Sequence, residues 1–207
     1  MIEWIIATRS HGKLLELVPL LAAHGITGIG LERAGIAATP EEELIEVFST
    51  FRENAIAKAA HFAAITGKSC LADDSGLCID ALDGGPGVRS RRFALDRGVM
   101  PSTQRDEDAC NNEVMLDACW DSGRAPPWAA HYACAAALVD GARVLVACGR
   151  TDGAILPDGT GDGGFGYDPF FVSGELGVSF GVASRALKAG VSHRARAVAN
   201  LVALRGS

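Results

Sequence analysis

The chain lacks the features of several specialised protein classes. It has no apolar run near the roughly 18 residues that a membrane-spanning helix needs; the longest, residues 133–139, suits a buried strand. Its first residues become polar too soon for a signal peptide. Basic residues are not in excess, because 19 Lys and Arg face 25 Asp and Glu, for a formal net charge of −6. We therefore expect neither a membrane protein nor one that coats nucleic acid by charge.

Cysteine motifs are also missing. The six cysteines include no Cys-x-x-Cys pair and no Cys/His cluster with zinc spacing. We expect six small core thiols in a reducing cytoplasm, with a disulfide framework as the minor alternative. Glycine is abundant instead: it supplies 25 of 207 residues, about 12%, against roughly 7% in average usage. The backbone must therefore turn sharply or approach a ligand closely at several places.

The spacing of apolar residues alternates between strand and helix patterns along the chain. Thr50 and Glu53 form a capping box that opens a helix ending at Gly67, and Ser192 is a predicted N-cap. Crossover helices together with a hairpin predict an α/β domain with a mixed sheet, spanning residues 1–207 as one bilobed unit. Strands are expected at residues 3–7, 69–72, 77–81, 128–139 and 143–150, and further helices after residue 13 and at 102–120, 184–189 and 192–204.

A polar turn joins the first predicted strand to the first helix. Backbone N–H groups at a helix N-terminus hold phosphate, and a lysine there adds a cation. The turn lacks the glycine pair and the Gly-Lys-Ser/Thr ending of a P-loop, so an ordinary strand-to-helix turn is the alternative. Its residues are Thr8, Arg9, Ser10, His11, Gly12 and Lys13.

Two adjacent carboxylates, Asp73 and Asp74, lie at the end of an apolar stretch. Neighbouring side chains of a strand point to opposite faces, so we expect only one of them to face a given site. A carboxylate there can hold Mg²⁺, whereas the alternative is an Asx-type turn over residues 73–76. Glu46, between two apolar residues, is the acid of its region that we expect to be fixed in place, and residues 41–43 are expected to be solvated.

Two further segments predict a nucleotide site. Four glycines within six residues precede or flank Phe165, and this ring or that of Tyr167 can stack on a base. The alternative is a tight turn whose aromatic rings fill the core. A Ser-His-Arg segment at 192–194, with Lys188 upstream, predicts a pocket for an anion or a carbonyl oxygen; the alternative is a solvated basic face.

In this order the motifs resemble the inosine triphosphate pyrophosphatase family. The resemblance implies an elongated α/β fold with a mixed sheet, flanking helices and two lobes around a central cleft. It also implies a homodimer that hydrolyses noncanonical purine triphosphates (ITP, dITP or XTP) to the monophosphate and pyrophosphate. The matching segments are residues 8–13, 51–55, 73–77, 86–88, 163–169 and 192–194.

Motif positions in that family imply roles for individual residues. Asp74 is the implied catalytic acid/base and a contact for Mg²⁺, and Glu46 is the second implied metal contact, with Glu43 as the alternative. The remaining positions imply substrate contacts: Thr8, Arg9, Ser10, His11, Gly12, Lys13, Lys58 and Arg92 for the phosphates, and Ser75, Phe165, Gly166, Tyr167, Asp168, Lys188, His193 and Arg194 for the nucleotide and its base.

The sequence departs from the family pattern at two positions, and two other functions stay open. Ser10 replaces the usual Asn, and Arg89 stands where a Tyr is usual. The altered Ser10 keeps open a nucleotide-sensing module that binds with little turnover. An aspartyl-phosphatase with Asp73 or Asp74 as nucleophile is the other alternative, although such enzymes use an Asp-x-Asp spacing that is absent here.

Overall fold

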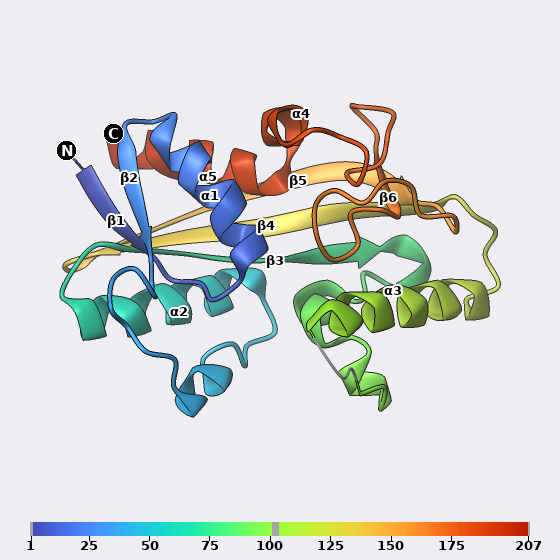
Figure 1. Ribbon diagram of the computed structural model, residues 1–207, viewed down its shortest axis with the longest axis horizontal. Coiled ribbons are helices and arrows are strands. Elements are labelled where there is room, and N and C mark those ends of the chain that lie inside the picture. Colours follow the sequence, from blue (N-terminus) through green and yellow to red (C-terminus); the bar gives the residue numbers. More distant parts are fainter. Residues whose placement is uncertain (1, 101–103, 207) are drawn as a thin grey trace. The chain divides into compact units, whose positions relative to one another are not determined.

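The computed structural model describes residues 2–100 and 104–206. Six strands form one sheet in the order β2-β1-β3-β4-β5-β6 (Figure 1). The chain divides into two compact units, of which the first comprises Met1–Asp74, Cys134–Arg150 and Ser192–Ser207, and the second Ser75–Ala133 and Thr151–Val191. Strands β3, β4 and β5 each contribute residues to both units. The predicted α/β class with a mixed sheet is confirmed.

The elements alternate along the chain much as the apolar spacing predicts. The strands are β1 (Ile2–Ile6), β2 (Ile26–Gly30), β3 (Cys70–Ile79), β4 (Trp128–Asp140), β5 (Arg143–Ile155) and β6 (Phe171–Ser173). The α-helices are α1 (His11–Ala22), α2 (Phe51–Thr66), α3 (Gln104–Asp121), α4 (Arg185–Val191) and α5 (His193–Gly206), and 3₁₀ turns are η1 (Pro40–Leu44), η2 (Asp80–Leu82), η3 (Gly87–Arg92) and η4 (Leu95–Arg97). The predicted helix start at residue 102 lies outside the described residues.

Strand β1 organises the first unit, where it runs parallel to both β2 and β3. Trp4 and Ile6 pack with buried residues of α1 and α5, whereas Ile5 and Ala7 pack with buried residues of α2. Figure 1 shows α1 and α5 on one side of β1 and α2 on the other. Because β1 is covered on both faces, its sequence is almost continuously apolar, as expected of a buried parallel strand.

The boundaries of α2 follow the predicted capping chemistry. Thr50 Oγ1 accepts a hydrogen bond from Glu53 N at 3.2 Å and donates one to Glu53 Oε2 at 2.6 Å. Gly67 ends the helix in the left-handed conformation, with φ +64°, which glycine adopts without strain. The capping box and the terminal glycine are therefore confirmed.

Strand β3 differs from the prediction. Two separate strands at 69–72 and 77–81 and the Asx-type turn between them are wrong, because β3 runs unbroken through residues 70–79. Glycine is needed at position 76 because the backbone of Gly87 approaches it closely, and not because the chain turns there. A Cβ on Gly76 would lie 2.2 Å from Gly87 O. Ser90 Oγ accepts the hydrogen bond of Leu77 N at 2.9 Å, which fixes this approach. The two carboxylates thus lie within a strand.

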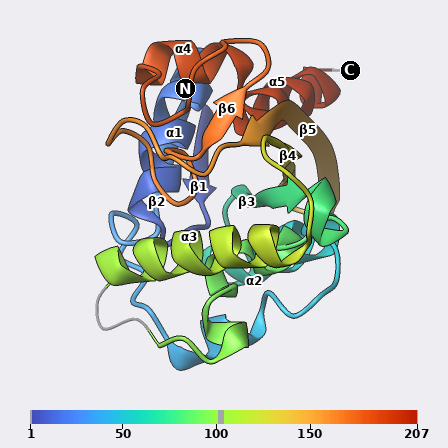
Figure 2. The same ribbon diagram turned by 90° about the vertical axis from the view of Figure 1, so that its right-hand side faces the viewer.

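The second unit has an aromatic core. Tyr132 and Phe171 lie 4.7 Å apart by ring centroids, and Phe171 and Phe180 lie 5.1 Å apart. Buried Met115 and Cys119 of α3 belong to the same core, and Figure 2 shows α3 along one side of this unit's strands. Strands β2 and β6 were not predicted: β6 is only three residues long, and β2 contains two glycines that interrupt its apolar pattern.

Two expectations from composition can be compared with the structure. All six cysteines are free thiols, as predicted, but the prediction that all six lie in the core is wrong: four are buried, whereas Cys110 is half-buried and Cys148 is exposed. None of the helices within the described ranges is both long and apolar enough to cross a lipid bilayer.

Candidate active site

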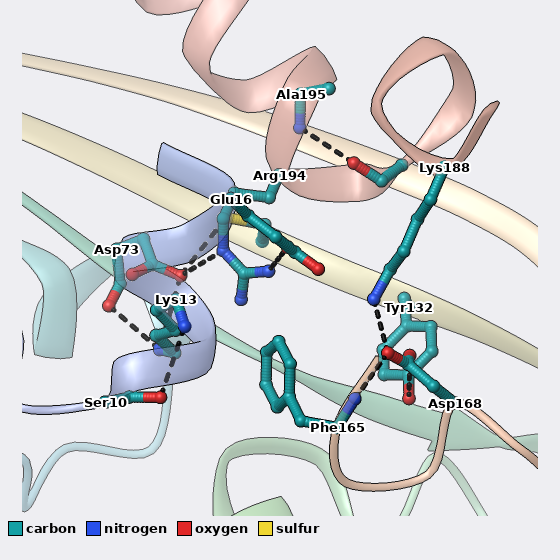
Figure 3. Close-up of polar contacts among 12 residues, drawn as sticks. Ser10, Lys13, Glu16, Asp73, Tyr132, Phe165, Asp168, Lys188, Arg194 and Ala195 are labelled. Atoms are coloured by element: carbon teal, nitrogen blue, oxygen red, sulfur yellow. Dashed lines mark hydrogen bonds and ion pairs between the residues drawn. The ribbon is translucent and has the colours of Figure 1, made fainter. Parts of the chain in front are cut away.

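In the first unit, Asp73 is a fully buried counter-ion. Arg194 Nε donates a hydrogen bond to its Oδ2 at 3.0 Å, and Lys13 Nζ lies 3.2 Å from the same oxygen (Figure 3). Lys13 also donates to the backbone oxygen of Asp73 at 3.3 Å. Burial alone would raise the pKa of Asp73, but attraction to Lys13 and Arg194 outweighs it and holds the pKa well below its usual range. Asp73 is therefore ionised and neutralised by two cations.

Arg194 lies between two carboxylates, because its Nη1 pairs with Glu16 while its Nε pairs with Asp73 (Figure 3). Only 1% of the residue is exposed, and these carboxylates raise its pKa against the effect of burial. The guanidinium thus belongs to a group of charged residues that we call the acid cluster (Asp73, Asp74, Glu46 and Glu16 with Lys13, Lys58 and Arg194), whereas the motif placed it among the base contacts. Sequence reasoning missed Glu16, although it lies three residues after Lys13 and therefore on the same face of α1.

Asp74 has a different environment from its neighbour. Asn54 Nδ2 donates to its Oδ2 at 3.0 Å, and the residue is 8% exposed. Burial raises the pKa of Asp74, Glu46 adds to this, and the pull of Lys13 and Lys58 offsets only part of the rise. Neighbouring carboxylates of one strand therefore have opposite pKa shifts, as the two faces of a strand allow. Asn54 was missed as a site residue, although it lies in a matching family segment.

Lys58 and Glu46 form an ion pair beside Asp74. Burial lowers the pKa of Lys58, but Glu46 and the two aspartates outweigh it and raise the pKa overall. Burial likewise raises the pKa of Glu46, and Lys58 reverses this shift. The Glu46 side chain stays 34% exposed, whereas Glu43 belongs to the exposed residues. The structure thus brings Glu46 to the acid cluster.

The polar turn before α1 has the expected helix-start geometry. Ser10 is the N-cap, and its Oγ accepts a hydrogen bond from Lys13 N at 3.3 Å. Thr8 Oγ1 accepts one from Ser10 N at 3.2 Å. His11 and Gly12 lie in the first turn of the helix. Their backbone N–H groups therefore project out of its N-terminal end, where an anion is favoured.

Arg9 holds a loop. Its guanidinium pairs with Glu42 at 2.7 Å and donates to the backbone oxygens of Ile36 and Ala37 at 2.8 and 2.9 Å. The hydrogen bond to Glu42 is the main reason that the pKa of Arg9 is raised. Its side chain is therefore committed within the first unit, which leaves its backbone as the part available to a phosphate.

In the second unit, the Phe165–Asp168 loop surrounds a buried ion pair. Asp168 is 2% exposed, pairs with Lys188, and accepts hydrogen bonds from Phe165 N at 2.9 Å and Tyr132 OH at 3.3 Å (Figure 3). Lys188 Nζ lies 5.1 Å from the centroid of the Phe165 ring, within reach of a cation–π interaction. This arrangement fixes both ends of a short loop around the half-buried Phe165 ring.

Tyr167 is part of the core. Its hydroxyl donates to Ser90 O at 2.7 Å, and burial raises its pKa far above the usual range. Of the two aromatic rings considered for base stacking, only that of Phe165 is partly exposed. Ser75 in β3 and Arg92 at the end of η3 are both half-buried.

Two remaining residues were singled out in the sequence. His193 opens α5 in the first unit and is 3% exposed. The Ser192 hydroxyl caps this helix by accepting a hydrogen bond from Ala195 N at 3.2 Å. The predicted N-cap is thus confirmed. Arg89, which stands where the family has Tyr, pairs with Asp96 at 2.7 Å and so belongs to a surface ion pair.

The donor chemistry of the first unit fits a magnesium ion. Its acid cluster contains four carboxylates, those of Asp73, Asp74, Glu46 and Glu16, against the cations of Lys13, Lys58 and Arg194. This leaves one negative charge in excess. Among the residues that the structure describes, no three His, Cys, Asp or Glu side chains gather as a metal-binding group. Mg²⁺, however, is usually held by only one or two carboxylates, together with waters and substrate phosphates. Asp74 and Glu46 can provide these two carboxylates.

Comparison with known proteins identifies the family of the chain. A model of the Ham1 family matches residues 4–204. The chain is 40% identical over 201 residues to the dITP/XTP pyrophosphatase of Ralstonia nicotianae, which covers 96% of this chain and 94% of that protein. Similar solved structures are a HAM1 protein from Coxiella burnetii (TM-score 0.81, 32% identity, 100% of both chains) and the Ham1 protein of Staphylococcus aureus (TM-score 0.76, 30% identity, 99% and 98%). The resemblance seen in the motifs is confirmed, and the chain belongs to the Ham1 family.

Proposed function

We propose that this protein hydrolyses noncanonical purine nucleoside triphosphates to the monophosphate and pyrophosphate. The observation that carries the proposal is the acid cluster of the first unit, where Asp74, with a raised pKa, lies beside Lys13 and Lys58. A relative that is 40% identical over nearly the whole chain bears the name dITP/XTP pyrophosphatase, which supports this substrate class. Asp73 does not suit an aspartyl-phosphatase nucleophile, because it is fully buried and bound to two cations.

Asp74 is the proposed proton acceptor. A carboxylate whose pKa is raised by burial accepts a proton from water more readily than an ordinary aspartate does. Asn54 holds its Oδ2 and so fixes the direction of the carboxylate. In the proposed reaction Asp74 takes a proton from the water that attacks the α-phosphorus, and the bond to the pyrophosphate oxygen breaks. The proton returns to solvent when the products leave.

The cations of the first unit are proposed to bind the triphosphate. Lys13 and Lys58 reduce its negative charge, and the N-terminus of α1 offers backbone N–H groups to one phosphate. Arg92 of the second unit is proposed as a further phosphate contact. Asp74 and Glu46 would hold Mg²⁺, which when bound stabilises the negative charge of the leaving pyrophosphate. Lys58 keeps Glu46 ionised, so that this carboxylate is available to a cation.

Base selection is proposed to use an aromatic surface and buried donors. The half-buried Phe165 ring offers a stacking surface. Buried His193 and Lys188 are donors suited to the 6-oxo group of hypoxanthine or xanthine. Adenine has an amino group at this position and would leave such donors unpaired. Sites that hydrogen-bond a substrate group reject analogues lacking it by up to about 10⁴–10⁵.

The cellular setting of this activity comes from the resemblance and the composition. We propose a cytoplasmic homodimer that removes aberrant nucleotides before polymerases use them. Sedimentation velocity at micromolar concentration measures the oligomeric state, and a monomer there would remove the dimer from the proposal.

The decisive experiment identifies the phosphate product. Purified protein is incubated with ITP, XTP, GTP or ATP, with Mg²⁺ or with EDTA, and the released phosphate is analysed by phosphorus NMR. We expect pyrophosphate from ITP and XTP, much less from ATP, and none in EDTA. Release of orthophosphate would contradict the mechanism, and binding of ITP without any product would favour the nucleotide-sensing module.

A further inference from the structure

Helix α3 holds the Phe165–Asp168 loop from outside. Asp108 Oδ2 accepts a hydrogen bond from Gly166 N at 2.9 Å, and Asn112 Nδ2 donates one to Gly166 O at 3.0 Å. Asp108 and Asn112 are four residues apart and therefore share one face of α3. Both backbone groups of Gly166 are thus bound to the same helix face.

The loop needs such external contacts. Gly166 has φ +61° and Gly164 has φ +73°, and a Cβ on Gly164 would lie 2.0 Å from Asp168 Oδ2. The loop therefore requires glycine at these positions, yet glycine loses more conformational freedom on folding than any other residue. The Asp168 side chain binds Phe165 N from within the loop, and hydrogen bonds from a regular helix restrict the backbone at Gly166.

The presence of Asn at position 112 is explained better by its hydrogen bond to Gly166 than by the packing of α3. Its Oδ1 is buried and, within the described part of the chain, accepts no hydrogen bond. An unsatisfied buried acceptor reduces stability, so an apolar residue would pack better at this position. The neighbouring Asn111 has both groups satisfied, by Ala94 N at 2.8 Å and Arg91 O at 2.9 Å. Asn111 therefore ties η3 to α3, whereas Asn112 binds the backbone of Gly166.

We propose that Asp108 and Asn112 are positioning residues for purine recognition, which they serve by fixing the backbone beside the Phe165 ring. The inference rests on the proposed function, in which this ring stacks on the base. A loop freed from α3 would present the ring in the stacking position for a smaller fraction of the time, and substrate affinity falls with that fraction. Turnover of bound substrate should change little, because Asp74 and Lys13, to which the chemistry is assigned, belong to the other unit.

Four variants separate the hydrogen bonds from other properties of α3. Asn112→Asp has nearly the same shape but cannot donate to Gly166 O, and Asp108→Ala removes the acceptor for Gly166 N. Asp108→Asn keeps an acceptor oxygen without the charge and should rescue function. Asp117→Asn is the matched control, because Asp117 is an exposed acid on the same helix.

The measurements are KM and kcat for ITP, together with the ITP dissociation constant from calorimetry. For Asn112→Asp and Asp108→Ala we expect KM and the dissociation constant to rise about fivefold to tenfold, with kcat within about twofold of the parent. Asp108→Asn and Asp117→Asn should match the parent. In a Phe165→Ala background, Asn112→Asp should have no further effect on KM, because the ring through which it acts is gone.

The proposal is overturned if KM for Asn112→Asp equals that of Asp117→Asn, or if Asn112→Asp raises KM equally with and without the Phe165 ring. The turnover of ITP by the parent protein distinguishes failure of the proposed function from failure of the positioning role. A parent that yields no pyrophosphate from any purine triphosphate refutes the proposed function. A parent that turns over ITP while all four variants match it refutes only the positioning role.

Discussion

Replacing the adjacent aspartates one at a time should have unequal effects on stability, with a large loss for Asp73 and none for Asp74. Asp73→Asn removes the charge that neutralises Arg194 and Lys13 at 3.0 and 3.2 Å inside the first unit. A charge pair at about 3 Å with an effective dielectric constant of about 20 is worth roughly 5 kcal/mol, and removing one partner of a buried pair typically costs about 3–5 kcal/mol. For a chain of this length that corresponds to a fall in Tm of about 6–20 °C.

Asp74→Asn should leave the fold as stable as the parent or make it more stable. The raised pKa of Asp74 means that its ionised form is disfavoured in the folded state, so a neutral amide relieves that cost. The same substitution removes the proposed proton acceptor and should abolish pyrophosphate release while ITP still binds. Differential scanning calorimetry at pH 7 and a pyrophosphate assay measure both effects. The reasoning is refuted if Asp73→Asn unfolds within 2 °C (about 1 kcal/mol or less) of the parent, or if Asp74→Asn is destabilised as strongly.

Three further predictions follow from contacts described above. Thr50→Ala should lower the free energy of unfolding by about 1 kcal/mol, since it removes the N-cap of α2, and urea unfolding at unchanged m-value measures this; an unchanged midpoint would contradict the capping role. Glu46→Gln should raise the Mg²⁺ concentration needed for half-maximal pyrophosphate release at least several-fold, and an unaltered Mg²⁺ titration would remove Glu46 from the proposed metal site. The depressed pKa of Asp73 means that its stabilising contribution is complete above the unfolded-state pKa of 3.8 and is lost as the pH falls toward the lower folded pKa. Acid unfolding followed by circular dichroism should therefore show a shallower loss of stability below that pH in Asp73→Asn than in the parent.

Local chemistry made much of the fold predictable. The capping box at Thr50, the glycine that ends α2 and the serine that caps α5 act through contacts within a few residues, so sequence spacing is sufficient to find them. The unbroken β3 was mispredicted because Asp, Ser and Gly together are typical of a turn. What keeps residues 73–76 extended is non-local: Gly87 and Ser90 approach Gly76, which no spacing rule can show.

The acid cluster was only partly predictable for a similar reason. Lys13, Lys58, Glu46 and Asp74 were identified by motif, and the structure brings them together within the first unit. The commitment of Arg194 to Asp73 and Glu16 could not be read from sequence, because these residues lie 121 and 178 positions from it. Contacts between such distant residues depend on how the helices pack on the sheet.

The path of the chain limits how this protein can be divided. It passes between the two compact units at residues 74/75, 133/134, 150/151 and 191/192. Any single cut therefore leaves at least one unit lacking a segment, so we expect split halves to fold poorly unless they are expressed together. In evolutionary terms, neither unit can be exchanged by one crossover, because each is made of chain segments that the other unit interrupts.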